Sequence, residues 1–292
     1  MKNQLLPELG KKTYVMGIIN LTPDSFSGDG LLRERDYINT ALLQAEHFIQ
    51  DGCDILDLGA ESTRPGAAAI GAEEELSRLL PVVQSLREEL PDAILSIDTY
   101  KAETAWVCLA EGAHIINDIW GFRFDPAMGS TVAEAGATAI LMHNRTQGAQ
   151  AVSSELGGRY EGVQYDDIVT EVRDWLAEAV DLAVEAGVGP DKIIIDPGIG
   201  FGKTIEQNLF LLKHIDMLRD LGFPILLGIS RKGFIGHTLN LPQGERLEGS
   251  LAANAWGVLH GVDILRVHDV RETVRLARML DAIRFSELPQ DQ

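Results

Sequence analysis

Short apolar runs recur along the chain, and each ends at a polar or charged residue. We expect them to form eight strands, near residues 14–19, 53–59, 93–98, 114–118, 138–142, 193–196, 224–229 and 263–267. Near-continuous runs such as KIIID and FPILLG are typical of parallel strands covered on both faces. A helix-like stretch follows each run. This alternation predicts one α/β domain over residues 1–292, a (β/α)8 TIM barrel with its core at about 14–285.

Glycines and capping residues mark the expected helix boundaries. A glycine follows a helix-like segment and precedes an apolar run at Gly52, Gly112, Gly136, Gly187, Gly222 and Gly261. Asp125 followed by Pro126 is interpreted as an N-cap with proline at N1, and Thr204 with Gln207 as a capping box. Residues 144–164 are polar and rich in Gly and Ser, which predicts a loop inserted over the rim after the fifth strand. A doubly wound open sheet is the alternative fold, because spacing alone does not prove closure.

Polar residues at the strand ends are the first candidates for a site, because barrel enzymes place their chemistry at the C-terminal face. Asp98, Asn117 and Asp196 end the third, fourth and sixth runs. Together their oxygens suit a flat heterocycle whose edge presents several N–H donors, since a carboxylate accepts two parallel N–H bonds. Taken singly, each of the three could instead cap a strand end.

Charge adds a second expectation. With 25 Lys and Arg against 44 Asp and Glu, the formal net charge is −19, which argues against nucleic acid or anionic membranes as partners. The candidate strand ends nevertheless carry a group of cationic side chains: Arg64, Lys203, Arg231, Lys232, Arg266 and His268. Local positive charge on an acidic protein predicts a small anionic ligand. Scattered solvated charge is the alternative.

Two strand-end motifs suit phosphate. The letters ESTRPG place Thr63 and Arg64 after the second run, where hydroxyl, backbone N–H and guanidinium groups are available. Arg266 and His268 are two residues apart on the last strand, so both side chains share one face. A capping turn with a surface arginine, and a packed core histidine, are the respective alternatives. The adjacent Arg231 and Lys232 are expected to point to different sides, one of them toward the ligand.

The letters DPGIGFGKT do not form a phosphate-binding Walker A loop, because Pro197 stands where its first glycine is needed. The glycines there would let backbone approach a ligand, and Phe201 would offer it an apolar face. Cys53 and Cys108 are expected to be buried free thiols. The absence of a membrane-spanning or signal-type apolar stretch leads us to expect a cytoplasmic protein.

Eight motifs in order, MGIINLTPDSFSGDG, LGAESTRPG, SIDTYK, INDIWG, LMHNR, DPGIGFGKT, GISRKGFIG and GSLAANAWGVLHGVDILRVHDV, resemble dihydropteroate synthase over about Val15 to Val270. The resemblance implies a transferase of folate biosynthesis that is a sulfonamide target. It would join (7,8-dihydropterin-6-yl)methyl diphosphate to 4-aminobenzoate, with release of diphosphate. It also implies a homodimer and Mg²⁺ as cofactor.

The resemblance assigns roles to matching positions. Asp98, Asn117, Asp196 and Lys232 would bind the pterin, with Lys232 and Asp98 as catalytic candidates. Asn20 would bind Mg²⁺ with the diphosphate. Thr63, Arg64, Arg266 and His268 would hold the diphosphate, while Pro65, Phe201 and Ser230 would border the aminobenzoate.

One departure and two rivals qualify these expectations. The family's first loop usually has the letters SFSDGG, whereas this chain has SFSGDG, so the acid stands at Asp29 and its role is left open. A pterin-binding methyltransferase domain that serves a corrinoid is one rival, but it would lack a diphosphate site. A catalytically silent pterin-binding protein is the other, and Asn20, Asp98, Lys232 and His268 argue against it.

Overall fold

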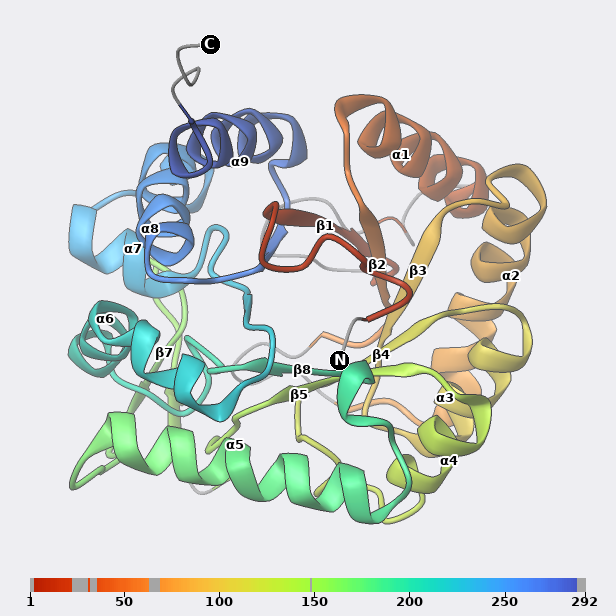
Figure 1. Ribbon diagram of the computed structural model, residues 1–292, viewed down its shortest axis with the longest axis horizontal. Coiled ribbons are helices and arrows are strands. Elements are labelled where there is room, and N and C mark those ends of the chain that lie inside the picture. The colour runs from red at the N-terminus through yellow and green to blue at the C-terminus, as the bar shows by residue number, and fades with distance from the viewer. Residues whose placement is uncertain (1–2, 23–30, 32–35, 63–68, 148, 288–292) are drawn as a thin grey trace, which may run out of the picture.

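Eight parallel strands form a barrel surrounded by helices in the computed structural model of the protein (Figure 1). The structure describes residues 3–22, 31, 36–62, 69–147 and 149–287. The barrel strands are β1 (Tyr14–Asn20), β2 (Ile55–Gly59), β3 (Ile94–Asp98), β4 (Ile115–Asp118), β5 (Thr138–Met142), β8 (Ile193–Asp196), β9 (Leu226–Leu227) and β10 (Ile264–Val267).

The helices lie outside the barrel and connect successive strands (Figure 1). They are α1 (Tyr37–Asp51), α2 (Ala72–Glu89), α3 (Ala102–Ala110), α4 (Met128–Ala135), α5 (Ile168–Glu185), α6 (Ile205–Lys213), α7 (Gly233–Leu239), α8 (Leu247–Leu259) and α9 (Val270–Arg284). Short 3₁₀ turns are η2 (Pro190–Lys192), η3 (Ile215–Leu221) and η4 (Gln243–Glu245). All eight predicted strands are present, with boundaries displaced by a few residues.

The sheet closes into a barrel. Its strand order is β8-β5-β4-β3-β2-β1-β10-β9, and a parallel bridge between Ile195 and Ile225 joins the two ends. The backbone N–H of Ile195 also donates to the carbonyl of Pro224 at 2.9 Å. The prediction of a (β/α)8 barrel is therefore confirmed, and the open doubly wound sheet is wrong.

Side chains alternate along each strand, and this alternation sets the layers inside the barrel. One interior layer is apolar and takes a residue from every barrel strand, with Leu6 of the N-terminal segment packed against it: Met16, Ile55, Ile94, Ile115, Ile140, Ile194, Leu226 and Ile264. Moving two residues on, the same faces carry Asp57, Ser96, Asn117, Asp196 and Arg266. Side chains two residues apart on a strand face the same way, so an apolar layer is followed by a polar layer nearer the strand ends.

The predicted boundary signals are largely confirmed. All six glycines named above have positive φ, from 62° at Gly136 to 99° at Gly187, the left-handed conformation that ends a helix without a Cβ clash. Thr204 and Gln207 form the expected capping box of α6. The N-cap prediction at Asp125 is wrong, because α4 begins at Met128 after Ala127. The Asp125 carboxylate instead accepts the N–H of Ala127 and, across the rim, the N–H of Ala102 at the start of α3.

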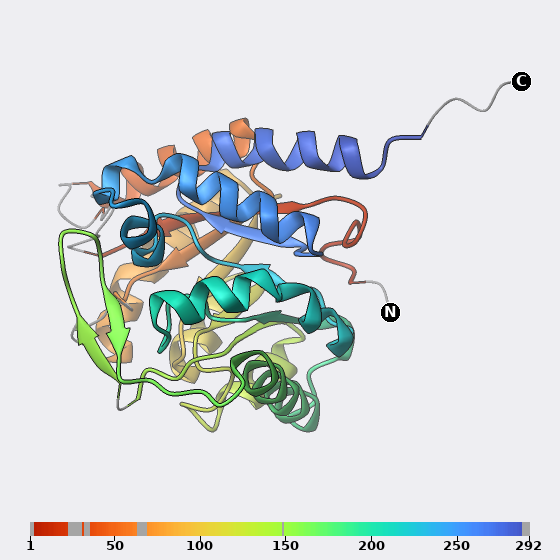
Figure 2. The ribbon, with the colours of Figure 1, turned by 90° about the vertical axis from the view of Figure 1, so that its left-hand side faces the viewer.

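Residues 144–164 contain secondary structure that the sequence did not predict. β6 (Gln150–Val152) and β7 (Arg159–Glu161) pair as an antiparallel hairpin. These strands are too short to show an alternating pattern, so composition alone indicated a loop. The hairpin lies at the end of the barrel opposite the N-terminus (Figure 2), so the predicted position over the rim is confirmed.

Cys53 and Cys108 are both free, as predicted, and Cys108 has no exposed surface while Cys53 is partly buried. Burial raises the pKa of each thiol to about 12. Among the helices in the described ranges, none combines the length and apolar composition needed to cross a bilayer.

Candidate active site at the carboxyl ends of the strands

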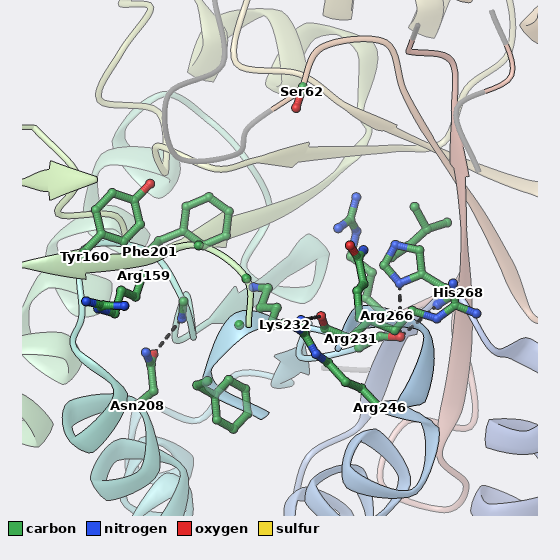
Figure 3. A pocket seen from close by; sticks show the side chains of 18 of the residues that line it. Ser62, Arg159, Tyr160, Phe201, Asn208, Arg231, Lys232, Arg246, Arg266 and His268 are labelled. Carbon is green, nitrogen blue, oxygen red and sulfur yellow. Dashed lines mark hydrogen bonds between the residues drawn. The ribbon is translucent and has the colours of Figure 1, made fainter. Parts of the chain in front are cut away.

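A cavity opens at the carboxyl ends of the barrel strands, where the polar layer meets the rim loops. Most of its lining comes from residues far apart in the chain, including Asn20, Asp98, Phe201, Lys232, Arg266 and His268. In Figure 3, Lys232 lies between Phe201 on one side and Arg266 with His268 on the other. The convergence follows from the parallel barrel, which brings every strand end to the same face.

Arg266 reaches across the mouth of the barrel. Its Nε donates to Asp57 at 2.6 Å and its Nη2 to Asp98 at 2.7 Å. Asp57 is fully buried and also accepts the hydroxyl of Ser96 at 2.5 Å. Arg266 is therefore held by acids of β2 and β3, and its cationic charge is partly balanced before any ligand arrives.

Burial and the opposite charges of neighbouring side chains shift the pKa of Asp98, and likewise that of Arg266, in opposite directions. Desolvation raises the pKa of Asp98 to about 7, while Arg266 opposes that rise. For Arg266, burial alone would lower the pKa, but Asp57 and Asp98 more than compensate and raise it. A carboxyl group with a raised pKa in a cavity is a common feature of functional sites.

Asn117 and Asp196 lie toward the carboxyl ends of β4 and β8 and are not among the residues that line the cavity. The Asn117 side chain donates weakly to Asp57 at 3.5 Å, and Asp196 accepts the N–H of Gly198 at 2.7 Å. Both are buried. Register places Asn117 directly beside Asp98 on the neighbouring strand. Burial raises the pKa of Asp196, opposed first by the positive charge of Lys232.

Lys232 precedes α7 and extends into the cavity. Its Nζ donates to the carbonyl of Ile199 and lies 4.6 Å from the ring centroid of Phe201. Burial lowers the pKa of Lys232 to about 8, with Asp196 opposing the fall. The ammonium group of Lys232 therefore interacts electrostatically with Asp196 of the polar layer and lies near the ring of Phe201. Because its pKa is about 8, the side chain can lose its proton at mildly alkaline pH.

Arg231, the other member of this adjacent pair, also lines the cavity. Its guanidinium forms two hydrogen bonds to Asp269, at 3.0 and 2.5 Å, and its backbone has a positive φ of 57°. Arg246 holds the same turn, because its Nη1 donates to the Arg231 carbonyl at 3.0 Å. Ser230, immediately before, contacts His268 through its hydroxyl and the ring Nδ1 at 3.1 Å.

Lys203 lines the cavity, but the loop after β8 holds its side chain. It is 1% exposed, and its Nζ lies 2.9 Å from Nδ1 of His143 and donates to the carbonyls of Gly198 and Phe201. Burial lowers the pKa of Lys203 well below its ordinary value, and does the same for His143. Lys203 thus fixes the backbone that presents Phe201.

Glu61 anchors the start of the loop after β2. Its carboxylate accepts the hydroxyl of Tyr100 at 2.6 Å and pairs with Lys101, which also contacts the buried Glu75 at 3.2 Å. Glu61 and Ser62 line the cavity. This network fixes the point from which the segment carrying Thr63 and Arg64 departs.

The structure brings together most of the predicted site residues. Asn20, Asp98, Phe201, Ser230, Lys232, Arg266 and His268 line one cavity, whereas Asn117 and Asp196 are buried toward the ends of β4 and β8 and are not among its lining residues. Thr63, Arg64 and Pro65 lie outside the described residues, as does Asp29. Sequence reasoning missed Asp57 as the partner of Arg266, although it ends an apolar run. It also missed Arg159, Tyr160 and Arg246, for which no periodic signal exists.

Comparisons with known proteins agree with this geometry. The family model described as pterin binding enzyme matches residues 16–268. The dihydropteroate synthase of Bacillus subtilis is 45% identical over 273 residues, covering 94% of this chain and 89% of the relative. A crystal structure of dihydropteroate synthase from Clostridium difficile, in the presence of pteroic acid, has a TM-score of 0.85 and 43% identity, covering 96% of this chain and 99% of that one.

A second solved structure is similar over nearly the same length. Dihydropteroate synthase of Xanthomonas albilineans with 4-aminobenzoic acid has a TM-score of 0.84 and 36% identity, and covers 94% of each chain. With the family model matching most of the chain and the fold and cavity in agreement, the chain belongs to the dihydropteroate synthase family of pterin-binding enzymes.

Proposed function

We propose that this cavity condenses (7,8-dihydropterin-6-yl)methyl diphosphate with 4-aminobenzoate to give 7,8-dihydropteroate and diphosphate. The observation that carries the proposal is the convergence of Asp98, Asn117, Asp196 and Lys232 on one end of the barrel, beside Arg266 and His268. Acceptors for a heterocycle thus lie next to cationic groups suited to a phosphate leaving group. Family membership supports the same reaction.

The pterin is proposed to enter the polar layer of the barrel. Asp98 and Asp196 accept its N–H groups, Asn117 offers both donor and acceptor, and Lys232 donates to its ring carbonyl. Buried carboxylates are costly without such partners. The Asp98 carboxylate accepts one bond from Arg266 and keeps further acceptor sites that the ligand can use.

The reaction breaks the C–O bond at the pterin methylene and forms a C–N bond to the amine, which then loses a proton. Negative charge grows on the departing diphosphate, and stabilisation of such charge is often the largest catalytic contribution. Arg266 on β10 and His268, the residue that follows β10, both line the cavity and are proposed to serve this purpose. Thr63 and Arg64, outside the described residues, complete the proposed diphosphate site.

Mg²⁺ is the proposed cofactor, and the residues present are compatible with it. Asn20, at the end of β1, lines the cavity and offers a carbonyl oxygen. Mg²⁺ usually takes one or two protein oxygens together with substrate phosphates, so no dedicated cage of acids is required. When bound, the ion would neutralise charge on the diphosphate.

The aromatic amine is proposed to bind against Phe201 and Ser230, with Pro65 also on its border. Phe201 supplies an apolar face beside Lys232. The amine of 4-aminobenzoate is neutral at pH 7, so attack needs no strong base. A proton acceptor is required only afterwards.

A homodimer is also proposed, through the face formed by α6, α7 and α8. Large apolar side chains are exposed there: Phe210, Leu239, Trp256 and Leu259. The Trp256 indole N–H donates to the carbonyl of Leu212, which places α8 beside α6 on this face.

Sedimentation equilibrium tests the stoichiometry, and a Leu259→Glu variant that stays dimeric would contradict the assigned face. Cell fractionation tests the proposed cytoplasmic location.

The experiment for the reaction is to mix the purified protein with both substrates and Mg²⁺ and to measure released diphosphate and dihydropteroate. We expect stoichiometric release. A protein that binds the pterin diphosphate without turnover would be a silent binder, and methyl transfer without diphosphate release would support the corrinoid-linked rival. Lys232→Ala should weaken pterin binding, whereas His268→Ala should mainly raise the KM for the diphosphate substrate. Unchanged kinetics in both would contradict the assigned site.

A further inference from the structure

The β6–β7 hairpin, which is inserted after β5, contributes side chains to the cavity. Arg159 and Tyr160 of the hairpin line the same cavity as Phe201 and Lys232. In Figure 3 they lie on the side of Phe201, away from Arg266 and His268. The hairpin therefore borders the cavity on the side away from the proposed diphosphate groups.

Close backbone contacts hold the hairpin against the start of α7. A Cβ added at Gly233 would lie 2.2 Å from the carbonyl oxygen of Gly158, and one at Gly157 would lie 2.9 Å from the Cα of Gly233. Only glycines permit this approach. The buried Arg246 packs against Gly157 at the same contact, where its Nη1 would lie 3.1 Å from an added Cβ. The position of Arg159 is thus fixed relative to Lys232, which immediately precedes α7.

The cations around the cavity differ in how firmly acids hold them. Arg266 is held by the buried Asp57 together with Asp98, and Arg231 by a two-bond contact to Asp269. Arg159 also forms two hydrogen bonds to its acid, Glu161, at 3.0 and 2.7 Å, but these side chains remain 32% and 46% exposed. Exposed ion pairs contribute little, about 0–1 kcal/mol, so a ligand carboxylate can take the place of Glu161.

The direction of the aromatic substrate follows from its chemistry. Its amine has to reach the pterin methylene near the barrel axis, and its carboxylate lies at the opposite, para end of the ring. With the ring against Phe201, the carboxylate points outward toward the hairpin. We propose that Arg159 is the specificity-determining residue that pairs with this carboxylate, an inference that rests on the proposed function.

The test compares Arg159→Leu with the wild-type enzyme, using 4-aminobenzoate and the uncharged 4-aminobenzamide as alternative amines. We expect the KM for 4-aminobenzoate to rise about tenfold, equivalent to about 1.4 kcal/mol, with kcat retained. The KM for the amide should stay within about twofold, because it has no charge for Arg159 to recognise. Arg145→Leu is the matched control, since Arg145 lies on the same insertion and pairs with Glu171 of α5 but does not line the cavity.

A second variant works in the opposite direction. Glu161→Gln removes the acid that competes for Arg159, so the KM for 4-aminobenzoate should fall about two- to threefold. An equal rise for both amines in Arg159→Leu would show a loss of hairpin shape and overturn the inference, as would unchanged values for both. Absence of turnover in the wild-type enzyme is a separate result, which would contradict the proposed function itself.

Discussion

The carboxylate of Asp57 on β2 accepts the Nε–H of Arg266 on β10 at 2.6 Å, which joins two strands across the polar layer of the barrel. Asp57 is fully buried and does not line the cavity, whereas Arg266 does. One member of the pair thus serves the structure while the other faces the ligand. This contact fixes the Arg266 side chain within reach of Asp98.

Removal of this buried partner should be costly. We expect Asp57→Asn to lower the free energy of unfolding by about 3 kcal/mol, because breaking a buried ion pair leaves a charge only partly compensated. Urea denaturation measures the change. Asp174→Asn, which alters an exposed pair with Arg173, is the control and should change stability by less than about 0.5 kcal/mol. Equal effects in both variants would show that Asp57 has no special structural role.

Lys232 predicts a pH dependence of substrate capture. Its pKa is lowered by burial to about 8. The protonated form is the stronger donor to a ring carbonyl, and only that form carries the charge that attracts Asp196. We therefore expect kcat/KM for the pterin substrate to fall as the pH rises above about 8. The Lys232→Met variant should have a low kcat/KM for the pterin substrate at every pH, and its kcat/KM should not decline above pH 8. A decline that persists in the variant would assign it to another group.

The same lowered pKa has a consequence for stability. Between pH 8 and the ordinary lysine value of 10.5, the unfolded state binds more protons at this position than the folded state. The contribution of Lys232 to the free energy of unfolding should therefore increase, and the folded state become more stable, as the pH rises through this window. Chemical denaturation of wild type and Lys232→Met at pH 7.5 and 10 measures it: the difference between the two proteins should depend on pH. A constant difference would contradict the assignment.

Gly198 should tolerate no side chain. Its φ is 63°, and an added Cβ would lie 1.8 Å from the carbonyl oxygen of His143. We expect Gly198→Ala to cost more than about 3 kcal/mol through backbone strain and overpacking, and to displace the loop that carries Phe201. Gly244→Ala, where an added Cβ meets nothing within 4 Å, is the control. Thermal unfolding of the two variants compares them, and similar midpoints would refute the predicted clash.

Both cysteines should resist modification in the folded protein. Burial raises the pKa of each thiol to about 12, so almost no thiolate exists near neutral pH. We expect an aromatic disulfide reagent to leave Cys53 and Cys108 unmodified until urea unfolds the chain, and then to react with both. Rapid reaction of Cys108 in the native enzyme would show that α3 opens locally.

Local sequence patterns were sufficient for the strands and for most of the helix ends. In the run ILSID, Ile94 belongs to the interior floor, whereas Ser96 and Asp98, two and four residues later on the same face, are polar. The same alternation placed Asn117, Asp196 and Arg266 at strand ends, so their convergence followed once the strands were taken as a parallel barrel. Helix-ending glycines were equally clear, because the left-handed conformation is a local requirement.

Contacts between distant segments depended on the tertiary structure. No spacing along the chain relates Asp57 to Arg266, 209 residues later, or reveals that Lys203 is buried against His143. The hairpin strands are three residues long, too short for a periodic signal, and their position depends on glycine contacts with α7. Alternation of side chains is a property of the local backbone and is therefore written in the sequence. The pairing of charges across a barrel depends on closure, burial and the competing partners that folding brings within reach.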